Sequence, residues 1–169
     1  LITQALISWT RTSIFSSNLL DASSECQKAL TAIREDLLQS STKPANSEIS
    51  WDGTTLEFKV ATGSNPDGTT IYSANPVSYT LEAVSDTDIK RIKKQDTDGT
   101  EVSVGNYVSD WTDGSGDVKP AFEADITDPS NIVVTVTCVK GRGALLILVG
   151  IRLHQFCAEG GKTMRRFML

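Results

Sequence analysis

The sequence predicts an α+β fold in which a long N-terminal α-helix packs against one or more antiparallel β-sheets. Two observations lead to this fold class. Apolar side chains recur at steps of three and four residues up to about residue 41, which is the period of one helix face. After Pro44 the chain changes to short alternating segments separated by Asp, Asn, Gly and Pro, which is typical of successive β-hairpins.

Residues 1–41 are predicted to form one uninterrupted helix. Neither Gly nor Pro occurs before Pro44, so nothing ends the helix early. About forty residues at 1.5 Å each make a rod of roughly 60 Å. A small domain is shorter than that, so we expect the first part of the helix to protrude. The apolar stripe of this helix consists of Phe15, Leu19, Ala22, Cys26, Ala29, Ile33 and Leu37, and we expect the sheet to cover the part from Leu19 to Leu37.

The protruding end of this helix is the candidate partner-binding region. Apolar side chains on a helix that leaves its own domain have to be covered by a partner, an oligomer or a membrane. The alternative is that this end folds onto its own domain, which we favour slightly less. The residues predicted to bind a partner are Leu1, Ile2, Leu6, Trp9 and Phe15.

The remainder is predicted to be a β domain over residues 45–155, followed by a C-terminal tail over 156–169. Asp52-Gly53 is a strong hairpin turn, and Asp96 to Gly99 is a second turn. Residues 110–117 are predicted to form a polar loop. Strands are expected at 48–51, 54–61, 69–73, 77–83, 88–94, 100–108, 122–126, 132–139 and 145–153.

Composition excludes several classes of protein. The 169-residue chain has a net charge of −5 and no basic stripe, which argues against nucleic acid as a partner. No apolar run reaches eighteen residues, and the longest, at 144–151, suits a buried strand. Three cysteines do not make a disulfide scaffold. Cys26 is expected to act as a small apolar side chain, and a Cys138–Cys157 bridge has no support in the sequence.

Catalytic residues are not predicted. The chain has one histidine, His154, and no serine in a Gly-x-Ser-x-Gly turn, so we expect no enzyme activity. His154, Cys157 and Cys138 are too few ligands for a structural zinc site.

Calcium is the one metal that the sequence leaves open, because two acidic segments offer oxygen ligands. Asp96 and Asp98 begin a loop that resembles an acidic calcium loop, but its twelfth position is Tyr107 instead of a glutamate. The second segment carries Asp110, Asp113 and Asp117. The same residue types are ordinary turn formers, and that simpler interpretation is the one we favour. We therefore expect no cofactor, with calcium as the tentative exception.

Several segments together resemble one known family. In order, they are CQKALTAIREDLLQS at the end of the helix, the hairpin ISWDGTTLEFKV, the pair VSYTLEAVSDTDIKRIKK with its DGT turn, VGNYVSDW, and PAFEADITDPSNIVVTVTCVKG. Their arrangement resembles the minor pilins and pseudopilins of type IV pili and type II secretion systems, over roughly residues 19–140. The family's hallmark, Phe-Thr-Leu-Ile-Glu followed by about twenty apolar residues, does not occur within this sequence.

The resemblance implies a pilin-like fold and a non-enzymatic role as a filament subunit. It also implies other pilin or pseudopilin subunits as partners and an inner-membrane anchor formed by a segment before Leu1. The location would be extracytoplasmic, either periplasmic or at the cell surface. The alternative from the residues alone is an extracytoplasmic binding module, for calcium or a glycan, whose helix merely covers its sheet.

Overall fold

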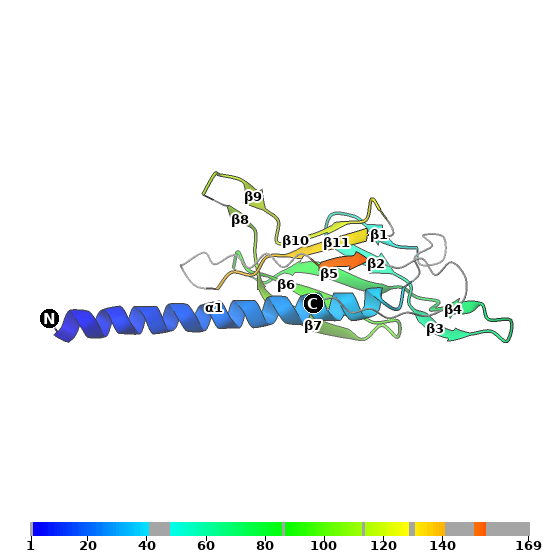
Figure 1. Cartoon of the computed structure of the whole chain (residues 1–169), viewed down its shortest axis with the longest axis horizontal. Helices are drawn as coiled ribbons and strands as arrows, with labels where there is room; N and C mark the ends of the chain where they lie inside the picture. Colours follow the sequence, from blue (N-terminus) through cyan, green and yellow to red (C-terminus); the bar gives the residue numbers. More distant parts are fainter. Residues whose placement is uncertain are drawn as a thin grey trace.

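A single long helix runs along one side of an antiparallel β domain (Figure 1). The computed structural model describes residues 2–40, 48–85, 87–112, 114–128, 131–140 and 151–154, and for residues 2–6, 8 and 151–154 it describes the backbone alone. These elements confirm the predicted α+β class.

The helix α1 spans Ile2–Leu37 and contains 36 residues without a break. At 1.5 Å per residue, its length is about 54 Å. Figure 1 shows its C-terminal half beside the sheets and its N-terminal half extending away from them. The helix ends in a tightened turn in which the backbone N–H and the hydroxyl of Ser40 both donate to the Leu37 carbonyl. The predicted helix extended to Ser41, which lies outside the described residues.

The larger sheet has five antiparallel strands in the order β1-β2-β5-β6-β7. Their bounds are β1 Ser50–Trp51, β2 Thr55–Phe58, β5 Val77–Ala83, β6 Lys90–Gln95 and β7 Glu101–Val108. The turn between β1 and β2 is the predicted Asp52-Gly53 pair, in which Gly53 has a φ of 99° and the Asp52 carboxylate accepts the N–H groups of Thr54 and Thr55. The β6–β7 turn is closed by the predicted Asp96 to Gly99 segment.

The smaller sheet has three antiparallel strands in the order β10-β11-β12. They are β10 Phe122–Asp125, β11 Asn131–Val136 and β12 Ile151–His154. The segment after β11 joins the two sheets, because Cys138 pairs with Val108 at the end of β7. Two backbone hydrogen bonds, from Ser109 to Thr137 and from Val139 to Tyr107, extend this junction.

The core lies between the helix and both sheets. Leu56 and Phe58 on β2, together with Tyr79 on β5, face the helix side, and the rings of Phe58 and Tyr79 are stacked at 6.1 Å. Trp51 on β1 meets Phe122 on β10 edge to face at 5.1 Å, so it packs within the sheets. The helix contributes Ala22, Cys26, Ala29, Leu30, Ile33 and Leu37 to this core.

Two predicted segments have a different structure from the one expected. The strand expected at 54–61 is divided, because the chain leaves the first sheet after Phe58. Val60 pairs with Ser40 and Ala61 donates to the Gln39 carbonyl, so the turn after the helix diverts the chain into β3 Ala61–Ser64, which pairs with β4 Thr70–Tyr72. The loop expected at 110–117 contains a small hairpin of β8 Trp111–Thr112 and β9 Val118–Lys119.

Candidate functional site

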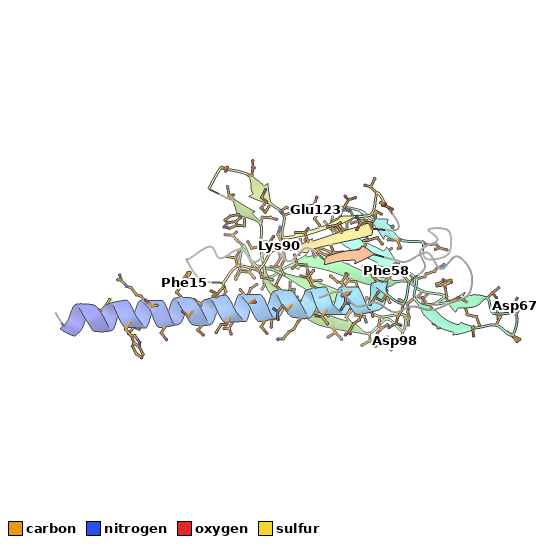
Figure 2. All side chains as sticks on the ribbon, in the orientation of Figure 1. Phe15, Phe58, Asp67, Lys90, Asp98 and Glu123 are labelled. Carbon is orange, nitrogen blue, oxygen red and sulfur yellow. The ribbon has the colours of Figure 1, made fainter. Side chains whose placement is uncertain are left out.

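The described side chains of α1 before Asn18 do not pack against the β domain. Every residue from 9 to 17 is exposed, as is Ile7, and the first fully buried helix residue is Ala22. The exposed fractions of the large side chains here are 48% for Ile7, 71% for Trp9, 57% for Ile14 and 46% for Phe15. Figure 2 shows Phe15 on the part of the helix that precedes the sheets. We call residues 7–17 the bare segment.

Exposed apolar side chains point in several directions around the bare segment. At about 100° per residue, Phe15 lies in line with the buried Ala22, seven residues later. Trp9 lies about 120° away from Phe15, and Ile7 and Ile14 lie about 80–100° away on the other side. Arg11 is the one charged residue in the bare segment. The segment is therefore apolar on more than one side and nearly uncharged.

The packed half of the helix begins at a polar clamp between α1 and β7. The Glu25 carboxylate accepts hydrogen bonds from the backbone N–H of Asn106 at 3.0 Å and from its side-chain amide at 2.8 Å. Lys28 Nζ lies 2.6 Å from the other carboxylate oxygen. Burial acts to raise the pKa of Glu25, but the hydrogen bonds from Lys28 and Asn106 outweigh it and lower that pKa.

A second polar group fixes the far end of the helix to the sheet. The Tyr79 hydroxyl donates to Asp36 at 2.5 Å, and Lys94 Nζ lies 2.7 Å from the same carboxylate oxygen. Burial and the Asp36 carboxylate raise the pKa of Tyr79 well above its ordinary value. Burial opposes the charge of Lys94, but Asp36 outweighs it and raises the pKa of Lys94. The helix is thus held to the β domain by polar contacts at Asp21, which pairs with Lys140, at Glu25 and at Asp36, all within its C-terminal half.

Four of the five predicted partner-binding residues belong to the N-terminal half of α1. Trp9 and Phe15 are exposed on the bare segment. Ile2 and Leu6 belong to the same helix, although their side chains are outside the description. Leu1 lies outside the described residues. Sequence reasoning missed three further exposed side chains, Ile7, Ile14 and Leu20, because they lie off the stripe that was used to find the helix.

The acidic residues considered for calcium are occupied by turns and ion pairs. Asp98 accepts the backbone N–H of Thr100, which lowers the pKa of Asp98, and Asp96 accepts that of Thr97. Asp110 pairs with Lys90 at 2.8 Å and accepts the N–H of Ala121, and these contacts, Lys90 foremost, lower the pKa of Asp110 against the effect of its partial burial.

The two acidic segments cannot share one ion. They flank β7, whose eight residues span about 23 Å between the Asp98 turn and Asp110. Asp117 follows the small hairpin turn and has an interaction of its own, and Asp113 lies outside the described residues. Within the part of the chain that the structure describes, His, Cys, Asp and Glu side chains form no group of three or more that would hold a metal.

Comparison with known proteins identifies no family for this chain. No protein-family model matches the chain, and no curated protein or solved structure is significantly similar to it. Among the described residues, α1 included, no helix has the combination of length and apolar character needed to span a bilayer.

Proposed function

We propose that this chain is a non-enzymatic structural subunit, of the minor pilin or pseudopilin type, of a type IV pilus or type II secretion filament. The observation that carries the proposal is the bare segment of α1, which leaves the β domain with its apolar side chains uncovered. We also propose that the fold is pilin-like. A helix half covered by an antiparallel sheet and half protruding supports this, together with the order of the segments quoted above.

The composition of the bare segment favours burial against protein over exposure to water. A helix that stays in water usually carries charges on its free faces, as α1 does beyond residue 20 with the exposed Lys28, Arg34 and Glu35. The bare segment instead has isoleucine, tryptophan and phenylalanine on several sides, separated by serine and threonine. Covering these side chains requires neighbours on more than one side.

Helices of neighbouring subunits are the occupants that fit this surface. In a bundle of parallel helices each helix has neighbours on several sides, whereas a groove in a globular partner would cover only one face of the helix. Small serine and threonine side chains also allow helix backbones to approach one another closely. In this arrangement the β domain lies at the periphery, and the clamp at Glu25 and Asn106 marks where the helix passes from its own domain to its neighbours.

The proposed anchor and location follow from the resemblance. A membrane-spanning segment preceding Leu1 would continue α1 and hold the subunit in the inner membrane before assembly. The β domain would then lie in the periplasm or at the cell surface.

Substitution on the bare segment tests the proposal. Trp9→Glu in the product of the complete gene should remove the subunit from the sheared filament fraction and leave the melting temperature of the isolated domain unchanged within about 1 °C, because Trp9 contacts solvent in the monomer. Val118→Glu is the matched control, since Val118 is 64% exposed but lies on the β8–β9 hairpin. Equal incorporation of both variants would contradict the proposal.

A further inference from the structure

Two cysteines that are far apart in the sequence meet beneath the helix. Cys26 lies on the buried face of α1, and Cys138 lies in the segment that joins the two sheets. Both side chains are completely buried and both are thiols. Cys26 Sγ donates to the carbonyl of Val136, two residues before Cys138, at 3.3 Å, and the two thiols are near enough to shift each other's pKa.

The backbones around this pair are held close together. A Cβ placed on Gly105 would lie 2.8 Å from the Cβ of Ala29, one turn along the helix from Cys26. Cys138 is fixed by its pairing with Val108, and its neighbours Thr137 and Val139 are hydrogen-bonded to the same strand end. A disulfide of about 2.05 Å between the two sulfur atoms would therefore join elements that already pack against each other.

We propose that Cys26 and Cys138 form a disulfide that ties the helix to the β domain. The oxidant is a low-molecular-weight disulfide such as oxidised glutathione. One cysteine thiolate attacks a sulfur of the oxidant, forms a mixed disulfide and releases one glutathione thiolate, which takes up a proton. The second cysteine thiolate then attacks the protein sulfur of the mixed disulfide, closes the bond and releases the second glutathione. Two protein thiols are oxidised while one oxidant disulfide is reduced to two thiols.

The contact between the two thiols shifts the pKa of each in the folded domain. The hydrogen bond from Cys138 lowers the pKa of Cys26, although burial opposes this effect, whereas the contact with Cys26 and burial raise the pKa of Cys138. Because both side chains are inaccessible in the folded domain, the bond forms during folding or on transient opening of the helix.

The position of the bond gives it a mechanical role. Cys26 is one turn beyond Ala22, where the helix first becomes buried, so the bond would lie at the point where the bare segment leaves the domain. A force that pulls on the bare segment would be resisted there by a covalent bond. This role, and an oxidising compartment in the cell, rest on the proposed function, whereas formation of the bond in purified protein does not.

Peptide mapping tests the proposal directly. The purified chain is refolded with oxidised glutathione, alkylated and digested with trypsin, which cleaves after Lys28, Lys140 and Arg152 and so puts each cysteine in a separate peptide. We expect the peptides that contain Cys26 and Cys138 to be joined. The mass of the joined species should be lower by two hydrogen atoms than the sum of the two reduced peptides. Alkylation of both cysteines in the refolded chain, or a bond from either one to Cys157, would overturn the proposal.

Two variants separate the bond from general effects on folding. Cys157→Ser should retain the bond, and its melting temperature should fall by about 10 °C on reduction, because the bond closes a loop of roughly 110 residues. The melting temperature of Cys26→Ser should not change on reduction. If Cys26→Ser does not fold, mapping of Cys157→Ser still decides the matter, and a Cys157→Ser chain whose melting temperature is unchanged by reductant would contradict the proposal. Failure of the filament assay with Trp9→Glu would leave this result unaffected.

Discussion

Glu25 shows how a single side chain fixes the point at which the helix joins the sheet. Its carboxylate receives three donors, two from Asn106 on β7 and one from Lys28 on the helix itself. Most of its side-chain surface is covered, with 14% exposed. A charge in such a place stabilises the fold only as long as its donors are present.

Glu25→Gln should lower the free energy of unfolding at pH 7 by about 1 kcal/mol, because the hydrogen bonds from Asn106 and Lys28 lose their charged acceptor. The folded-state pKa of Glu25 is lower than its unfolded value, so its stabilisation is present above about pH 4.3 and is lost as the pH falls through the folded pKa. Wild type should therefore lose more stability than the variant between pH 6 and pH 3, as urea unfolding at each pH would measure.

The matched control is Glu35→Gln, an exposed glutamate on the same helix. It should change the free energy of unfolding by less than about 0.5 kcal/mol at any of these pH values. If Glu25→Gln and Glu35→Gln lower the free energy of unfolding equally, the hydrogen bonds of Glu25 do not stabilise the fold beyond the effect of an exposed glutamate.

At the scale of elements, the helix and the larger sheet approach closely because small residues face each other. Gly105 on β7 lies against Ala29, and a methyl group at Gly105 would sit 2.8 Å from the Ala29 Cβ. After Ala29, the next atoms are the Glu25 carbonyl oxygen at 3.7 Å and the Ile92 Cβ at 3.9 Å, which are ordinary contacts. The pair Gly105 and Ala29 therefore sets the spacing between α1 and β7.

Gly105→Ala should lower the free energy of unfolding by about 1–3 kcal/mol, since the helix has to move away from the sheet to accept the methyl group. The cost should largely vanish when Gly105→Ala is made in an Ala29→Gly background, where the conflicting methyl group is absent. Chemical denaturation of the four proteins of this cycle measures the coupling. Additive effects would show that the contact does not set the spacing. Gly63→Ala is a control, because its nearest atom lies at 3.9 Å.

Elements that depend on local signals could be predicted from the sequence. The helix followed from the absence of Gly and Pro, and the β1–β2 and β6–β7 turns followed from Asp-Gly pairs. The break after Phe58 could not be predicted, since it depends on pairing between Val60 and Ser40 across the fold. The proximity of Cys26 and Cys138 could not be predicted from the sequence either, because it arises from the packing of α1 on the sheets.

The candidate site was predicted in part for the same reason. The apolar stripe predicted that the sheet would cover the helix from Leu19 to Leu37, and the structure confirms this for the stripe residues from Ala22 onward. Leu19 is only half-buried and Phe15 is exposed, because the sheets end before that part of the helix. Periodicity locates a face, but the extent of the covering sheet decides how much of that face is buried.

At the scale of the whole molecule, the account depends on a helix about 54 Å long that a small β domain covers only in part. Both polar clamps and the cysteine pair act on the covered half. The structure describes no buried side chain in the bare segment, and its exposed tryptophan, phenylalanine and isoleucine side chains are available to neighbours.

Photo-crosslinking in the source cell tests this central claim most directly. A benzophenone amino acid replaces Trp9 in the complete gene product, and in a control it replaces Val118 on the β8–β9 hairpin. The account predicts that crosslinks from position 9, identified by mass spectrometry, join the chain to another copy or to a protein with a similar apolar N-terminal helix, whereas position 118 gives none of these. Crosslinks from position 9 to the chain's own β domain alone, or the same partners from both positions, would contradict it.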